Sequence, residues 1–103
     1  RYVREGFTSD EELSLYDMLF RDDLSKTDIK KLKEVASSLL QNIKMKIAEF
    51  DHWTDMQETK AVINNLICNT LWTELPECYD EDSIPMYRQQ IYEYVYTRYK
   101  AVA

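Results

Sequence analysis

The chain has 103 residues, 45% of them hydrophobic, and a formal net charge of -6. This length fits one domain with enough apolar side chains for a core. The negative charge disfavours sequence-independent binding of nucleic acid, which draws on lysine and arginine paired with phosphates. One glycine and two prolines leave little turn chemistry for hairpins, so the composition predicts an all-α fold of a few long helices.

Residues 1–8 show no regular period, and we expect a leader or the end of an upstream linker there, followed by a single helical domain over residues 9–103. The first residue is Arg1 and not methionine, which suggests a piece of a longer protein. No apolar run approaches a membrane span of roughly 18 residues, and no secretory signal is present. Cys68 and Cys78 form no C-x-x-C pair and have no histidine at metal-ligand spacing. We therefore expect free thiols and a cytoplasmic location.

The first helix is predicted to be short. Ser9 followed by Glu12 forms a capping box, and acidic residues suit the positive end of a helix. The apolar side chains then recur at helical spacing, at Leu13, Tyr16 and Phe20. The helix is expected to end near residue 21 or 22.

A second, longer helix is predicted from about residue 28 to residue 49, after a polar connection that offers Ser25 or Thr27 as a cap. Its apolar stripe is almost unbroken and consists of Ile29, Leu32, Ala36, Leu39, Leu40, Ile43, Ile47 and Phe50. The opposite face carries lysines, among them Lys30, Lys33 and Lys44, which could contact DNA phosphates. A solvated polar face is the favoured interpretation, because every core stripe leaves such a side.

The third helix is predicted over residues 55–74. Thr54 followed by Gln57 forms a second capping box, and Pro76 biases Leu75 away from helical angles, which ends the helix. Its apolar face consists of Met56, Ile63, Leu66, Ile67 and Leu71. At about 100° per residue, Trp72 points well away from that face.

The fourth helix is predicted over residues 84–100, after an acidic loop at residues 76–83. Ser83 is the expected cap, and Pro85 falls in the first turn, where a missing N–H costs least. A narrow apolar stripe is flanked by tyrosines on both sides and consists of Ile84, Ile91, Val95 and Val102. Together these elements predict a compact bundle of about four helices with a short first helix.

The sequence contains no recognisable catalytic apparatus. His52 is the only histidine, and a capping or packing role is expected because no partner for catalysis or metal binding is near it in sequence. The carboxylates of Asp80, Glu81 and Asp82 lack the alternation and the glycine of a calcium loop, so a solvated loop is expected. No catalytic, cofactor-binding or metal-binding residue is predicted in this chain.

Several bulky apolar side chains lie outside the single apolar stripes that are predicted to form the core. They are Met45, Trp72, Tyr92, Tyr96 and Tyr99. Tryptophan and tyrosine are enriched in protein interfaces because they bury a large area and keep a polar tip. These five residues are the predicted partner interface. The alternatives are a four-helix core wide enough to take them and single exposure of each side chain at the surface.

From Leu13 onward, the chain resembles the C-terminal helical domain of the R (motor and restriction) subunit of type I restriction enzymes. The similarity spans most of the chain and is carried by LSLYDMLF, IKKLKEVASSLLQNIK, FDHWTDMQETKAVINNLI, LWTELPECYDEDSI and IYEYVYTRY, in this order. The Trp-Thr turn, the Leu-Pro-x-x-Tyr stop and the Val-Tyr-x-x-Tyr ending are its most specific parts. The chain departs from the family in a third helix with Lys60 as its only basic residue and in the acidic loop that follows.

The resemblance implies a parent that is an ATP-dependent, site-specific deoxyribonuclease. Such a parent translocates DNA with ATP and Mg²⁺ and works in a complex with methylation and specificity subunits, while this piece is non-catalytic. We expect the piece to dock the motor onto the methyltransferase core. The alternatives are a DNA guide that uses the helix-two lysines, Lys31 and Lys46 included, and a structural cap on the motor lobes of its own chain.

Overall fold

The computed structural model describes residues 6–7 and 9–100. Its elements are α1 (Asp10–Leu19), α2 (Lys26–Ile47), the 3-10 turn η1 (Trp53–Asp55), α3 (Gln57–Glu74), the 3-10 turn η2 (Glu81–Ser83) and α4 (Ile84–Tyr99). The described part of the chain contains four α-helices and no strand, which confirms the predicted all-α class, the number of helices and the short first helix.

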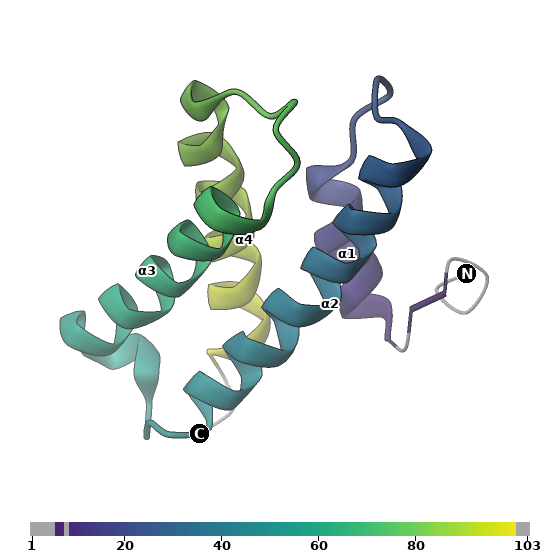
Figure 1. The fold of residues 1–103 in the computed structure, drawn as a ribbon. Helices are drawn as coiled ribbons and strands as arrows, with labels where there is room; N and C mark the ends of the chain where they lie inside the picture. Colours follow the sequence, from purple (N-terminus) through teal and green to yellow (C-terminus); the bar gives the residue numbers. More distant parts are fainter. Residues whose placement is uncertain (1–5, 8, 101–103) are drawn as a thin grey trace.

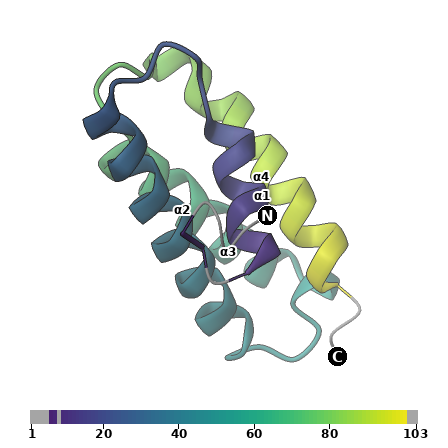
Figure 2. The ribbon, with the colours of Figure 1, turned by 90° about the vertical axis from the view of Figure 1, so that its right-hand side faces the viewer.

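The four helices pack around one shared core. α1 packs on α2, α2 on α3, α3 on α4, and α4 returns to α1, with each neighbouring pair antiparallel (Figure 1). The view in Figure 2 shows α1 and α2 towards the viewer, with α3 and α4 behind them. Polar contacts tie the helix ends together, since Lys31 at the start of α2 pairs with Glu74 at the end of α3, and Arg98 in α4 pairs with Glu11 in α1.

The core follows the predicted stripe most closely on α2. Its fully buried side chains in that helix are Leu32, Ala36, Leu39, Leu40 and Ile43. On α1, however, Leu15 and Leu19 are completely buried, whereas Phe20, predicted to face the core, is 40% exposed. α1 touches both α2 and α4, so its buried face is wider than a single helical stripe. Phe20 follows the last residue of α1 in an extended conformation, so it does not continue the helical stripe.

The serines before α1 and α2 cap these helices, because each side-chain oxygen accepts a hydrogen bond from a backbone N–H of the first turn. The Oγ atom of Ser9 accepts a hydrogen bond from the backbone N–H of Glu12 at 3.3 Å. The Oγ atom of Ser25 accepts one from the backbone N–H of Asp28 at 3.1 Å. α2 therefore begins directly after Ser25, at Lys26, two residues earlier than predicted.

The predicted cap of α3 at Thr54 is wrong. The chain first makes a tight 3-10 turn, in which the backbone N–H of Asp55 donates to the carbonyl of His52 at 2.9 Å, and α3 begins only at Gln57. The hydroxyl of Thr59 donates to the carbonyls of Trp53 and Met56, which ties this turn to the helix. Met56 precedes the helix and is 47% exposed, so its predicted place on the apolar face is also wrong.

A matched pair of substitutions tests this difference between the two helix starts. Ser25→Ala is expected to lower the free energy of unfolding by about 0.5–2 kcal/mol, because it removes a cap acceptor. Thr54→Ala is expected to change it by less than about 0.5 kcal/mol, the usual range for positions without such a role. Urea denaturation of both variants measures the two values, and a cost at Thr54 equal to that at Ser25 would contradict the structure.

The end of α3 and the start of α4 lie where the sequence predicts them, but the predicted cap of α4 does not form its hydrogen bond. α3 stops at Glu74, before Leu75 and Pro76, as predicted. Ser83 precedes α4 and Pro85 lies in its first turn, but the hydroxyl of Ser83 donates to the carbonyl of Asp80 at 2.7 Å. Ser83 therefore closes the preceding turn and does not cap α4 through its side chain.

Part of the predicted leader belongs to the core. Phe7 is 5% exposed, and its ring centroid lies 5.3 Å from that of Tyr16 in α1. Gly6 precedes it with a φ of 87°, a left-handed angle that glycine adopts without strain. The rest of the predicted leader, residues 1–5 and residue 8, lies outside the described residues, as does Val102.

Candidate docking surface

The five residues of the predicted interface lie on different parts of the molecule. Met45 on α2 and Trp72 on α3 are 66% and 47% exposed. Tyr92, Tyr96 and Tyr99 on α4 are half-buried and pack against the core. Trp72 lies where α3 ends and α4 begins, whereas Tyr96 and Tyr99 lie in the last turns of α4, so these residues do not form one patch.

Two of the tyrosines in the predicted interface pack against the buried side chain of Trp53. This indole is 2% exposed, and its ring centroid lies 6.3 Å from that of Tyr92 and 5.8 Å from that of Tyr96, both in edge-to-face geometry. Edge-to-face pairs stabilise a fold beyond the area that they bury. Tyr92 and Tyr96 therefore have a structural role as walls around Trp53, which leaves Trp72 as the most exposed aromatic side chain of the predicted interface.

A pocket of about 240 Å³ lies beside Trp72. We call it the Trp72 corner, and its lining residues are Leu71, Trp72, Leu75, Pro76, Glu77, Tyr79, Glu81 and Ile84. Core residues form its floor, since Leu71, Tyr79 and Ile84 are buried. Its rim combines the indole of Trp72 with two exposed carboxylates.

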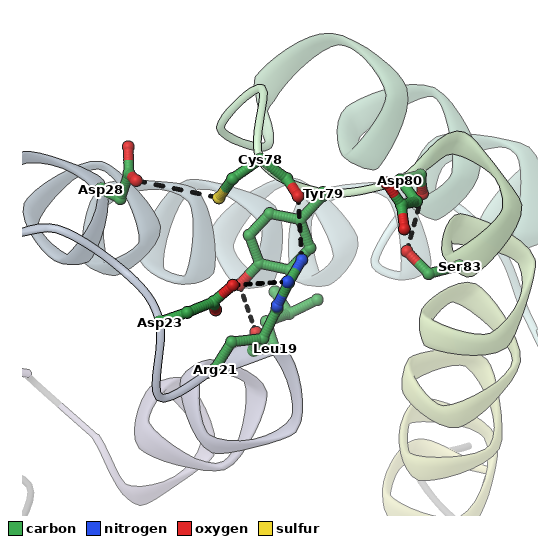
Figure 3. Close-up of polar contacts among 8 residues, drawn as sticks. All are labelled: Leu19, Arg21, Asp23, Asp28, Cys78, Tyr79, Asp80 and Ser83. Carbon is green, nitrogen blue, oxygen red and sulfur yellow. Dashed lines mark hydrogen bonds and ion pairs between the residues drawn. The ribbon is translucent and has the colours of Figure 1, made fainter.

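Tyr79, the tyrosine of the Leu-Pro-x-x-Tyr stop, forms part of the floor of the corner. Tyr79 lies in the predicted acidic loop, but it is 6% exposed and its hydroxyl donates to the backbone carbonyl of Leu19 at the end of α1 (Figure 3). Its ring meets Tyr87 edge-to-face at 5.6 Å, and the guanidinium of Arg21 lies 5.2 Å from its centroid. Burial raises the pKa of Tyr79, which keeps the phenol protonated and able to donate.

Arg21 joins the two connections at this end of the molecule. One guanidinium N–H donates to the backbone carbonyl of Cys78 at 2.9 Å, and another pairs with Asp23 at 2.7 Å (Figure 3). The thiol of Cys78 donates to Asp28 at 3.8 Å. Desolvation, followed by the charge of Asp28, raises the pKa of the Cys78 thiol. These contacts fix the α3–α4 connection against the α1–α2 connection, so the Trp72 corner has a supported backbone.

Both cysteines are free thiols among the described residues, as predicted. His52 departs from its predicted role, because its side chain is 60% exposed and makes no capping hydrogen bond. Instead, its backbone adopts a φ of 52° before η1, with Nδ1 at 4.0 Å from Asp55. No group of three or more potential metal ligands occurs within residues 6–7 and 9–100.

The lysines of the alternative DNA-guide hypothesis all lie on α2: Lys30, Lys31, Lys33, Lys44 and Lys46. Lys31 pairs with Glu74 at 3.2 Å and Lys46 pairs with Glu49 at 3.4 Å. These pairs compensate two of the five positive charges locally. Lys30, Lys33 and Lys44 are the predicted DNA contacts of this hypothesis, in a chain whose net charge is negative.

The hydroxyl of Tyr99 leads to a prediction about alkaline stability. Burial, followed by the charge of Glu11, raises the pKa of Tyr99 to about 12 from its ordinary value of 10.0. The fold thus favours the neutral phenol, so this stabilisation is complete below pH 10 and is lost as the pH rises towards 12. Urea denaturation over this range should show a smaller loss of unfolding free energy in Tyr99→Phe than in the original chain. Equal losses would mean that Tyr99 does not contribute.

Comparison of the chain with protein-family models, with curated proteins and with solved structures found no match. In the part of the chain that the structure describes, no helix is both long and apolar enough to cross a bilayer.

Proposed function

We propose that this chain is the non-catalytic C-terminal helical domain of the R subunit of a type I restriction enzyme, and that it docks the motor subunit onto the methyltransferase core. The family assignment is supported by the ordered sequence motifs described above, together with the four-helix architecture in which they lie. In this proposal the parent supplies ATP- and Mg²⁺-dependent DNA translocation and cleavage, and its partners are the methylation and specificity subunits.

The observation that carries the docking role is the exposure of Trp72. A tryptophan that is 47% exposed keeps a large apolar area in contact with water, although the core is already filled by other side chains. Tryptophan is among the residues that contribute most binding energy per side chain in protein interfaces. Trp72 also stands over a pocket whose floor is apolar, which gives a partner both an edge to contact and a cavity to fill.

A binding assay with the purified methylation–specificity complex tests this function. We expect the immobilised chain to retain the complex, and Trp72→Ala to abolish or strongly weaken the retention. Met56→Ala is the matched control, because Met56 is also 47% exposed but lies at the opposite end of α3. No retention by the original chain at high concentration would overturn the docking role, and equal losses in both variants would show that Trp72 has no special part in it.

The same preparation separates docking from the DNA-guide hypothesis. Docking predicts no measurable binding of duplex DNA at physiological salt, because the α2 lysines would have to hold phosphates on a chain with a net charge of -6. Binding that weakens steeply with salt and is lost on replacing Lys30, Lys33 and Lys44 by glutamine would favour the DNA guide.

A further inference from the structure

The Trp72 corner is an open pocket with an apolar floor and a polar rim. Its floor consists of Leu71, Tyr79 and Ile84, which are 0%, 6% and 4% exposed. The half-buried side chain of Leu75 and the ring of Pro76 border this floor, and the indole of Trp72 stands beside it. An apolar side chain that entered the pocket would lose contact with water on several sides, and Trp72 would lose part of its exposed area at the same time.

The charged residues that line the Trp72 corner are all acidic. Residues 74–86 contain five carboxylates and no lysine, arginine or histidine. Glu74 is paired with Lys31, whereas Glu77 and Glu81 line the pocket and form no ion pair with any residue that the structure describes. The carboxyl end of α3 adds the negative end of a helix dipole at the same place.

We propose that the Trp72 corner binds a basic segment of a protein partner, with one bulky apolar side chain in the pocket and a neighbouring arginine or lysine over the indole of Trp72. The proposal rests on the docking function above and adds the chemistry of the partner. Tryptophan is the aromatic side chain that best attracts a cation to its face. The carboxylates of Glu77 and Glu81 would then pair with the same or an adjacent cation, and an arginine fork suits a carboxylate best.

Charge complementarity selects this occupant over others. A second copy of the chain in a two-fold dimer would place the same acidic corner opposite itself, and like charges across an interface are unfavourable. The phosphates of a nucleic acid would meet the same repulsion. A basic segment, in contrast, would be drawn to the corner by the unpaired carboxylates before the apolar side chain docks.

A peptide selection tests the proposal without assuming the identity of the partner. A display library of random peptides is selected on the 103-residue chain and counter-selected on its Trp72→Ala variant. We expect enrichment of peptides in which a bulky apolar residue is flanked by arginine or lysine. The strongest peptide is then labelled, and its affinity is measured by fluorescence anisotropy at low and at high salt.

Two kinds of variant assign the binding to the corner. Trp72→Ala and the double variant Glu77→Gln/Glu81→Gln should each lower the affinity for the peptide by at least about tenfold, a change that a single interface residue commonly produces. Met56→Ala and the double variant Asp51→Asn/Glu58→Gln are the matched controls, since they remove an equally exposed side chain and two exposed carboxylates elsewhere. Circular dichroism confirms that each variant is folded.

Several results would overturn the proposal. These are the absence of any enriched peptide, enrichment of neutral or acidic peptides, equal weakening by the control variants, and a concentration-dependent dimer of the chain that Trp72→Ala abolishes. Retention of the methylation–specificity complex together with any of these results would leave docking intact and reject only the basic segment. Loss of that retention with a basic peptide still bound at the corner would reject the assembly role instead.

Discussion

Replacement of Trp53 by alanine is expected to lower the free energy of unfolding by about 3–5 kcal/mol, the cost of removing a large buried aromatic side chain. Trp53 is 2% exposed and is enclosed by Tyr92 and Tyr96. Its indole Nε1 has no hydrogen-bond partner among the described residues, so the loss comes from packing. Urea denaturation followed by far-ultraviolet circular dichroism gives the value.

Trp72→Ala is the matched control for Trp53→Ala, and its expected effect on stability is below about 0.5 kcal/mol, as is usual for exposed positions without a structural role. The pair tests the separation between a tryptophan that supports the fold and one that is available for binding. A loss at Trp72 as large as that at Trp53 would show that Trp72 belongs to the core, and the docking argument would lose its main support.

The second large effect is expected at Tyr79. Tyr79→Ala should cost about 3–5 kcal/mol, because it empties the floor of the Trp72 corner and removes the contacts with Tyr87 and Arg21. Tyr79→Phe keeps the ring but leaves the buried carbonyl of Leu19 without its donor, which should cost about 1–3 kcal/mol. The measurement is again the free energy of unfolding at neutral pH.

Tyr99→Phe provides the comparison for the hydroxyl of Tyr79. The hydroxyl of Tyr99 is buried without a hydrogen-bond partner in the part of the chain that is described, so its removal leaves no group newly unpaired. We expect little or no loss of stability from Tyr99→Phe at neutral pH. If Tyr79→Phe proved equally harmless, the bond between Tyr79 and Leu19 would not stabilise the connection.

Local patterns in the sequence were sufficient to predict most of the helices. The α2 stripe repeats over many turns, so small errors at single positions do not change the face that it defines. Ser9 and Ser25 act on backbone groups three residues away, and Pro76 acts on its own neighbour. Interactions of this range are visible in a sequence, and for this reason these predictions are confirmed.

The errors occurred where distant parts of the chain decide the outcome. Thr54 and Gln57 have the spacing of a capping box, but the burial of Trp53 and the bond from Thr59 favour a 3-10 turn instead. Tyr79 lies among acidic residues in the sequence, and its burial depends on α1, 60 residues away. An aromatic residue shortly after a Leu-Pro stop was the one local sign that the loop folds back on the core.

The candidate site was predictable only in part. The predicted rotation of Trp72 away from the apolar face of α3 agrees with its exposure, and Met45, which lies off the α2 stripe, is exposed as well. The role of Tyr92 and Tyr96 could not be derived, because it depends on where Trp53 is placed. The Trp72 corner itself combines residues from α3, the loop and α4, and no periodic pattern contains it.

Hydrogen exchange with and without the purified methylation–specificity complex tests the docking claim most directly. Docking at the Trp72 corner predicts slower exchange of backbone amides over residues 71–84 in the complex, and unchanged exchange around Met56 at the other end of α3. Unchanged exchange over residues 71–84 at saturating concentrations of the complex would contradict it.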